Sequence, residues 1–348
     1  MAHPANVSQN SPKFKKPSLE QLRTFYKMEI HPYISGLDRK RKSAEAFTLT
    51  VSLLIAGFVY FREKNIPRFS NGHDPLIFAG LVGLAIVVVG FAFIALFIRS
   101  KSFRSEFKHR VVSRLIERFY PELAYVPMGF VTADQFIESS LFTSDFNRYT
   151  GEDFFSGKHG SADFHFSELY VKRLEKVRTK SGQRTRVVDV FSGLFFSADF
   201  HRNFFFRTII KPDTAEGLLG VLGRGVQRVA YGERLVDLED PEFEKMFVVT
   251  ADNQVEARYI LTPAFMERIK NLRIKMDCQI YVSFVNSRVY VAIPLRENLF
   301  EPRIFGSICS MKDLTQFIQS VQTVVGLIDD LEINKDAFVS HGVKPPQQ

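Results

Sequence analysis

The chain has 348 residues, a mean hydropathy of -0.05 and a net charge of +8. Its basic excess lies in residues 1–45 and 99–110, whereas residues 111–348 carry 29 basic against 31 acidic side chains. This distribution excludes a basic nucleic-acid-binding domain. The two cysteines, Cys278 and Cys309, follow no metal or disulfide spacing, which favours a reducing compartment.

The N-terminal region is predicted to lead into a membrane. Residues 1–17 are polar and contain prolines, which is typical of a disordered leader. Residues 18–43 are predicted to form a juxtamembrane helix that Ser18 caps at its start. Apolar residues recur in this segment at helical spacing, so the helix either lies on the membrane or packs on a soluble domain.

Residues 44–98 are predicted to form a hairpin of two transmembrane helices, at about 46–61 and 75–98. The second span contains no charged residue from Pro75 to Ile98, and a helix needs roughly 20 apolar residues to cross the hydrocarbon core. The first span is shorter and close to the lower limit. Three glycines in the second span would allow close contact between helices, and these are Gly80, Gly83 and Gly90.

The basic residues beside the two spans predict their orientation. Four of them precede the first span, namely Arg39, Lys40, Arg41 and Lys42. Five follow the second span, namely Arg99, Lys101, Arg104, Lys108 and Arg110. Because short cytosolic flanks are enriched in Lys and Arg, both termini are predicted to lie in the cytosol.

The remainder is predicted to be a cytosolic α+β domain with antiparallel strands and a C-terminal helix. Residues 99–124 are expected to form a helical connector, residues 125–335 the domain, and residues 336–348 a flexible tail. Strands are expected at 163–171, 187–200, 203–210 and 245–249, and a hairpin at 279–284 and 288–294 around Asn286-Ser287. Helices are expected at 261–272, capped by Thr262, and at 312–331.

The sequence SADFH occurs twice and places Asp and His two residues apart on an expected strand. Asp163 and His165 would then share a face, as would Asp199 and His201. Such pairs suit a metal site or an acid–base group. The favoured interpretation is that these residues end exposed strands while the phenylalanines pack inward.

A second polar group lies at Arg148, Tyr149, Gly151, Glu152 and Asp153. Adjacent carboxylates could bind a cation or act as an acid and a base. Adjacent strand residues point to opposite faces, however. In a turn, carboxylates usually cap backbone N–H groups or face solvent. A capping role is therefore favoured here.

The most suggestive feature is a basic hairpin around Ser181-Gly182. It carries seven basic residues within a short stretch, namely Lys172, Arg173, Lys176, Arg178, Lys180, Arg184 and Arg186. The simplest interpretation is a solvated hairpin tip. In a domain tethered to a membrane, contact with anionic lipid headgroups is the functional alternative. Nucleic acid is disfavoured because no aromatic residues interleave with these charges.

Short stretches along the chain resemble the bacterial domain-of-unknown-function 3137 family of membrane proteins. They include FYKMEIHPYISGLDRKRK before the first span, RYTGEDFFSG at Arg148–Gly157, FHFSEL at Phe164–Leu169, VFSGLFFSADF at Val190–Phe200 and IDDLEIN at Ile328–Asn334. The sequence departs from the family's ending after Asn334, where KDAF follows. The resemblance implies a bacterial inner-membrane protein with a cytosolic α+β domain and no assigned activity.

The expected function is a non-enzymatic, membrane-anchored binding or scaffold module at the inner membrane face. Its expected partners are membrane lipids and an unidentified protein, with no nucleic acid, cofactor or metal, and a homo-oligomer is left open. One alternative is a metal-assisted hydrolase that uses Asp163, His165, Asp199 and His201. Another is an oligomeric membrane scaffold or pore component.

Overall fold

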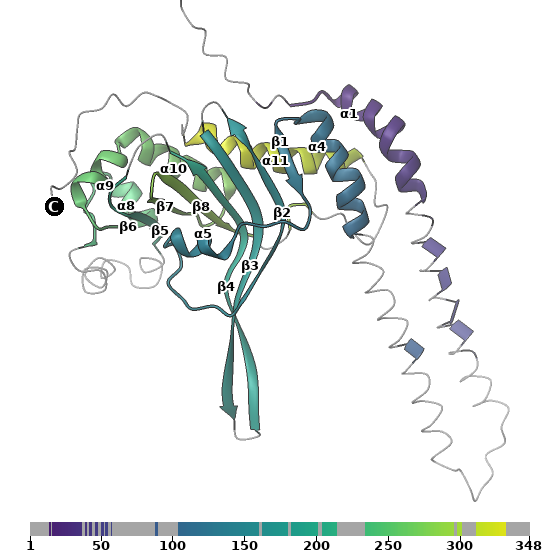
Figure 1. Cartoon of the computed structure of the whole chain (residues 1–348), viewed down its shortest axis with the longest axis horizontal. Coiled ribbons are helices and arrows are strands. Elements are labelled where there is room, and N and C mark those ends of the chain that lie inside the picture. The colour runs from purple at the N-terminus through teal and green to yellow at the C-terminus, as the bar shows by residue number, and fades with distance from the viewer. Residues whose placement is uncertain are drawn as a thin grey trace, which may run out of the picture. The chain divides into compact units, whose positions relative to one another are not determined.

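The computed structural model of the chain (Figure 1) describes most of the region beyond residue 103 and part of the N-terminal region. The described residues are 14, 16–36, 39, 42, 43, nine residues between 46 and 89, and 104–159, 162–179, 182–200, 204–213, 234–295, 298–300 and 311–331. The chain divides into two compact units. One comprises residues 1–16, 115–300 and 318–348, and the other comprises residues 17–114 and 301–317.

The smaller unit begins with the predicted helix and its predicted cap. The Ser18 hydroxyl accepts a hydrogen bond from the backbone N–H of Gln21 at 3.1 Å, and the Gln21 side chain accepts from the Ser18 N–H at 2.9 Å. This reciprocal capping box satisfies two N–H groups at the helix start. The helical residues continue to residue 36. They comprise α1 (Leu19–Phe25), the π-helical turn η1 (Tyr26–Ile30) and one further turn.

A second helical segment runs from residue 104 towards Pro121 and includes the π-helical turn η2 (Lys108–Val112) and α4 (Ser113–Phe119). Within the smaller unit, the Arg110 guanidinium lies 5.0 Å from the centroid of the Tyr33 ring, a distance suited to a cation–π contact. Pro121 ends the segment, as predicted, because proline cannot continue a helix.

The predicted transmembrane spans at 46–61 and 75–98 fall largely on residues that the structure does not describe. The nine described positions between 46 and 89 are helical. None of the helices described by the structure combines the length and the apolar composition that a membrane crossing requires. The two-span hairpin therefore stays a prediction.

The larger unit is built on an eight-stranded antiparallel sheet, which confirms the α+β class and the antiparallel strands. Its strand order is β1-β2-β3-β4-β8-β7-β5-β6. The strands are β1 (Leu123–Val126), β2 (Arg148–His159), β3 (Ala162–Thr179), β4 (Gly182–Asp199), β5 (Thr208–Pro212), β6 (Phe247–Ala251), β7 (Tyr281–Val285) and β8 (Arg288–Pro294). Each strand pair in this order is antiparallel.

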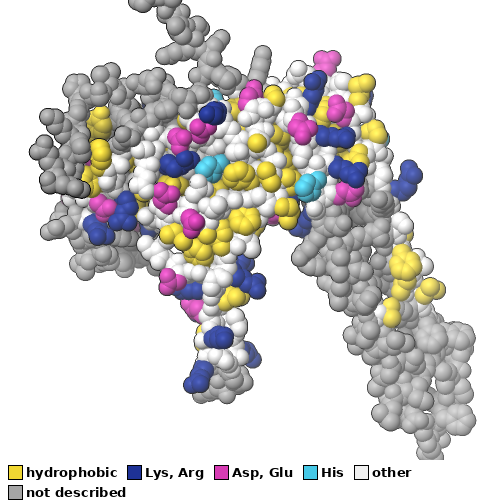
Figure 2. Space-filling view, viewed as in Figure 1, with side chains coloured by type: hydrophobic (Ala, Val, Ile, Leu, Met, Phe, Trp, Pro, Cys, Tyr) yellow, Lys and Arg dark blue, Asp and Glu magenta, His cyan; other side chains and the backbone are white. Residues whose placement is uncertain are grey.

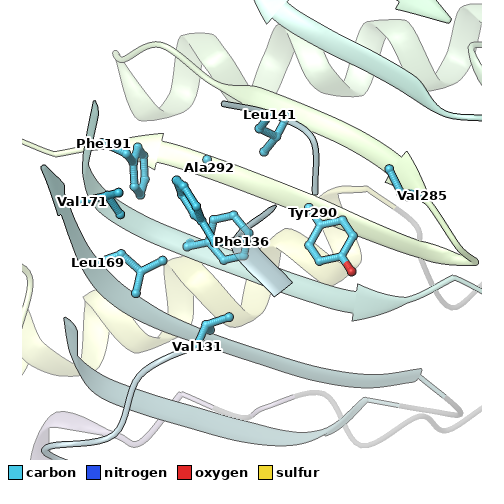
Figure 3. Packing of buried hydrophobic residues seen from close by; sticks show 10 residues of the cluster. Val131, Phe136, Leu141, Leu169, Val171, Phe191, Val285, Tyr290 and Ala292 are labelled. Atoms are coloured by element: carbon cyan, nitrogen blue, oxygen red, sulfur yellow. The ribbon is translucent and has the colours of Figure 1, made fainter. Parts of the chain in front are cut away.

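Helices cover both faces of this sheet. The short helix α5 (Ala133–Glu138) lies on one face, and residues 318–330 of α11 (Met311–Asp330) pass behind the sheet on the other (Figures 1 and 3). The second face also receives α10 (Pro263–Met276), whose Phe265 ring lies 5.6 Å from the ring of Phe284 in β7. Two further short helices are α8 (Pro241–Met246) and α9 (Gln254–Ile260).

The core on the α5 face is centred on Phe136, which is 1% exposed (Figure 3). Its ring lies within 6.0 Å of five other aromatic rings, those of Phe142, Phe146, Tyr149, Phe191 and Phe195. Aliphatic side chains from β3 and from β8 complete the cluster. The short helix α5 is therefore fixed to the sheet by an aromatic cluster.

Several local predictions are confirmed. The β7–β8 hairpin turns at Asn286 and Ser287, both with positive φ (50° and 61°), as a two-residue type I′ turn requires. Thr262 caps α10 by accepting a hydrogen bond from the Phe265 N–H at 3.3 Å. The C-terminal helix α11 lies within one residue of its predicted bounds.

Two predicted strands begin later than expected. The strand predicted at 203–210 begins only at Thr208, because the backbone N–H groups of Phe205 and Phe206 bend towards the Glu256 carboxylate at 3.2 and 3.0 Å. The strand predicted at 245–249 begins at Phe247, because Asp240 caps the helix α8, which contains Lys245.

Candidate functional site

Three carboxylates meet at a β-bulge between β2 and β3. Glu152 pairs directly with Glu168, and the register then shifts before Phe155 pairs with Phe166. Asp153 is in the shifted stretch and has a positive φ of 58°, which is uncommon for a residue other than glycine. The bulge turns Asp153 towards the side of the sheet that Glu152 and Glu168 share, so one carboxylate oxygen from each lies within 4.8 Å of the others.

Hydroxyl and backbone donors surround this carboxylate cluster of Glu152, Asp153 and Glu168. The Tyr125 hydroxyl donates to Asp153 Oδ1 at 2.6 Å. The Tyr170 hydroxyl lies 3.1 Å from Glu152 Oε1 and 3.0 Å from Glu168 Oε2, and so it bridges the two glutamates. These contacts tie β1, β2 and β3 together through side chains as well as through the backbone ladder.

Residues 298–300 close the cluster from another part of the chain. The Leu299 backbone N–H donates to Glu168 Oε1 at 2.6 Å, and the Asn298 side-chain amide lies 3.4 Å from Glu152 Oε1. The Phe300 ring, 1% exposed, lies 5.1 Å from the ring of Phe155. The carboxylate cluster thus anchors the residues that follow β8 on β2 and β3, which β4 separates from β8 in the sheet.

Burial and charge act together on the two tyrosines. Burial raises the pKa of Tyr125 well above its ordinary value, and the neighbouring Asp153 carboxylate raises it further. Burial and the Glu168 and Glu152 carboxylates raise the pKa of Tyr170 in the same way. Both hydroxyls therefore keep their protons at neutral pH and act as donors, and neither serves as a base.

The carboxylate cluster has the donor set of a hard cation. Asp153 is 0% exposed and Glu168 is 2% exposed, and Ca²⁺ and Mg²⁺ take carboxylate and carbonyl oxygens as ligands. Within the described part of the chain, this is the one group of three His, Cys, Asp or Glu side chains close enough to hold an ion.

The sequence pointed to two of the three residues but placed them in a turn. It expected Glu152 and Asp153 to cap or solvate a turn, whereas they lie in β2 next to a bulge. Glu168, which completes the cluster, was not singled out. Phe164, Phe166 and Glu168 are two positions apart and therefore share one face of the strand. A charged residue on this otherwise apolar face is the signal that could have identified Glu168.

The SADFH pairs occupy the face predicted for them but are held in ion pairs. Asp163 lies 3.2 Å from Lys158 Nζ, and Asp199 forms an ion pair with Arg288. His165 stacks on Phe154 with ring centroids 5.8 Å apart. His201 lies outside the described residues, so the four-residue metal or acid–base site stays a prediction.

The environment of His165 disfavours its charged form. Burial and, to a smaller extent, the Arg288 guanidinium lower the pKa of His165 to about 4. Its Nε2 is buried and has no hydrogen-bond partner. A proton on this ring would therefore be poorly solvated, and His165 is neutral at pH 7.

The basic hairpin is confirmed as the outer part of β3 and β4, here called the basic arm (residues 172–189). The β4 residues that precede Gly193 do not pair with β8, and they pair with β3 alone. The arm projects from the sheet, and dark-blue side chains line it in Figure 2. Near its base, Lys172 pairs with Asp189 at 3.3 Å and Arg173 pairs with Glu175 at 2.7 Å.

The outer arm is exposed and cationic. Four of its basic residues, Lys176, Arg178, Arg184 and Arg186, form no ion pair with any carboxylate that the structure describes. Two aliphatic side chains beside them are also exposed, Val177 at 39% and Val187 at 54%. Lys180 lies outside the described residues. Of the juxtamembrane group, Arg39 and Lys42 are exposed on helical backbone, whereas Lys40 and Arg41 are not described.

The fold and these sites define an α+β domain on an antiparallel sheet, with no assigned chemistry. Residues 189–333 match the model of the family described as "Protein of unknown function (DUF3137)". This match over the C-terminal part of the chain supports the family that the sequence resemblance predicted. No protein in the curated collection matches the chain.

Among solved structures, the chain is similar to the crystal structure of the mycobacterial trehalose monomycolate transport factor A, TtfA. The two chains share 12% sequence identity, with a TM-score of 0.33. The match covers 64% of this chain and 96% of that chain.

Proposed function

We propose that this protein is a membrane-anchored binding module whose basic arm contacts an anionic lipid surface. In this proposal, the apolar segments at 46–61 and 75–98 anchor the chain in the bacterial inner membrane, and the α+β domain lies on the cytosolic side. The observation that carries the proposal is the exposed outer arm, which presents four cations that no described carboxylate neutralises.

The register of the arm distributes these charges over both of its faces. Val177 pairs with Arg184, and Glu175 pairs with Arg186, so these side chains share one face. Lys176 and Arg178 lie on the other face, because successive strand residues alternate. A two-stranded ribbon with cations on both faces can lie against a charged surface on either side.

The expected gain in binding follows from the number of charges. Each Lys or Arg close to an anionic bilayer contributes roughly 1 kcal/mol. The four cations of the outer arm would then contribute about 4 kcal/mol, which corresponds to roughly a thousandfold in an equilibrium constant. The exposed valines add apolar area that can enter the interface. These charges therefore suffice to hold a tethered domain against an anionic bilayer.

The test uses the full chain reconstituted into lipid nanodiscs. An environment-sensitive fluorophore is attached at Gln183→Cys on the arm, in a background with Cys278→Ser and Cys309→Ser. The same fluorophore at Val255→Cys, an exposed position on α9, is the matched control. Nanodiscs contain either phosphatidylcholine alone or 30% phosphatidylglycerol, together with lipids that carry a quencher.

We expect quenching of the arm label in the phosphatidylglycerol discs, little quenching in pure phosphatidylcholine, and no lipid dependence at the control site. Neutralising the four outer cations to Gln should abolish the difference. The comparison variant neutralises four exposed basic residues elsewhere, namely Arg118, Lys158, Lys245 and Arg258, and should retain it. Equal quenching of the arm label in both lipids would refute the proposal.

A further inference from the structure

A second cationic feature lies away from the arm, in a cavity beside β5 and β6. Its volume is about 900 Å³, which is within the range of small-molecule sites. One wall is the strand face that carries Ile209 and Lys211, and the other is the segment that follows α5, with Phe142 and Phe146. All of these residues belong to the larger unit.

Three cations and two carboxylates line this cavity. Arg207 donates from Nε to Asp252 Oδ2 at 2.8 Å, and this pair is neutral as a whole. The Arg207 contact lowers the pKa of Asp252, and Arg234 lowers it further through its charge. The other carboxylate, Asp145, is exposed to solvent, where its charge is screened. Arg234 is exposed in the same way, so the partly buried Lys211 carries the less screened positive charge, and the three cations exceed the two carboxylates by one.

Lys211 is the most informative of these residues. It is partly buried on β5, and among the residues that the structure describes no carboxylate pairs with it. Burial lowers the pKa of its ammonium group, because a cation removed from water without a partner is destabilised. An anion bound in the cavity would supply the missing partner.

We propose that this cavity binds a small phosphate monoester. Lys211 and Arg234 together offer two positive charges, and a phosphate monoester carries about -1.5 to -2 at pH 7. The two terminal NH2 groups of the Arg207 guanidinium remain available, because the Asp252 carboxylate accepts from the Nε–H and from the Arg207 backbone. Ser140 and Thr250 also line the cavity; the Ser140 hydroxyl donates to the Glu138 carbonyl at 3.2 Å, and the Thr250 hydroxyl suits a phosphate oxygen.

The size and the apolar wall indicate that the ligand carries an organic part. A cavity of about 900 Å³ is far larger than a phosphate group. The rings of Phe142 and Phe146 and the side chain of Ile209 offer apolar contacts to that part. This site is separate from the basic arm, so its existence does not depend on the lipid-surface proposal.

The test is isothermal titration calorimetry on the full chain in a mild nonionic detergent. The probes are glycerol 3-phosphate, inorganic phosphate and a short-chain phosphatidic acid below its micelle concentration, with acetate at equal ionic strength as the carboxylate control. We expect saturable binding of the phosphate probes and none of acetate. The tighter of glycerol 3-phosphate and phosphatidic acid identifies a soluble metabolite or a lipid headgroup as the source.

The variants Lys211→Met and Arg234→Gln should each weaken binding of the tightest phosphate probe at least tenfold. Lys211→Arg, which keeps the charge, should bind more tightly than Lys211→Met. Lys245→Met removes an exposed lysine outside the cavity and should bind as the parent chain does. Circular dichroism melts of each variant establish that the fold is kept, and Lys211→Met should melt no lower than the parent.

Three results would overturn the proposal. The first is an absence of saturable heat with every phosphate probe. The second is acetate binding as tight as glycerol 3-phosphate. The third is unchanged phosphate affinity in a folded Lys211→Met variant.

Discussion

Acidification between pH 6.5 and pH 4 should weaken the fold through His165. A histidine in the unfolded chain takes up its proton near pH 6.5, whereas burial lowers the pKa of folded His165 to about 4. Between these values the unfolded chain binds more protons than the folded chain does. The free energy of unfolding therefore falls as the pH falls through this window, and above pH 6.5 the residue contributes no pH dependence.

The size of the effect follows from the separation of the two pKa values. The difference corresponds to a loss of about 3 kcal/mol once the pH is below 4, and about 2 kcal/mol at pH 5. The substitution His165→Leu removes the titrating group and keeps an apolar contact with the Phe154 ring. We expect the variant to lose about 2 kcal/mol less stability than the parent chain between pH 7 and pH 5.

Urea unfolding measures this difference at both pH values. The full chain is unfolded in mild detergent, and the near-ultraviolet circular dichroism of its tyrosines reports the transition. His31→Leu, which replaces an exposed histidine, is the matched control. If the parent and His165→Leu lose the same stability on acidification, the assignment of a neutral, poorly solvated His165 is wrong.

Three further substitutions test the packing around the sheet by the same urea assay. Phe136→Ala should cost about 3–5 kcal/mol, because it empties the centre of the aromatic cluster, and a loss under about 1 kcal/mol would contradict that role. Thr262→Ala should cost about 1 kcal/mol through the lost cap of α10, whereas Thr262→Ser should restore most of it. Tyr125→Phe should cost roughly 1.5–3 kcal/mol, since it removes a donor from the buried Asp153 carboxylate. Tyr281→Phe is the control and should cost less, because the Tyr281 hydroxyl does not bond to a carboxylate.

Local sequence signals predicted the elements whose geometry depends on nearby residues. Asn286-Ser287 specifies a two-residue turn by its tolerance of positive φ, and Thr262-Pro263 specifies a helix start through one side-chain acceptor and one fixed φ. The alternation of apolar residues in β8 and the apolar stripe of α11 are likewise local. These elements appear within one or two residues of their predicted positions.

The carboxylate cluster and the cavity could not be predicted in this way. Asp153 joins Glu168 only because a bulge reverses its direction in a strand, and its backbone N–H bonds to the Pro127 carbonyl from another element at 2.9 Å. Lys211 faces a cavity only because β5 pairs with β6 and β7, which follow it in the chain by more than 30 residues. Contacts at such separations leave no period or spacing in the sequence.

The pairing of β3 with β4 also sets how the basic arm can change in length. From the pair of Arg173 and Val188 to the tip, these strands pair only with each other, so residues lost from the tip in cross-strand pairs would leave every remaining pair in place. Loss of a residue from one strand alone would turn all later side chains to the opposite face. The reach of the arm is therefore adjustable in steps of about 3.4 Å, one residue pair at a time, without any change in the sheet beneath it.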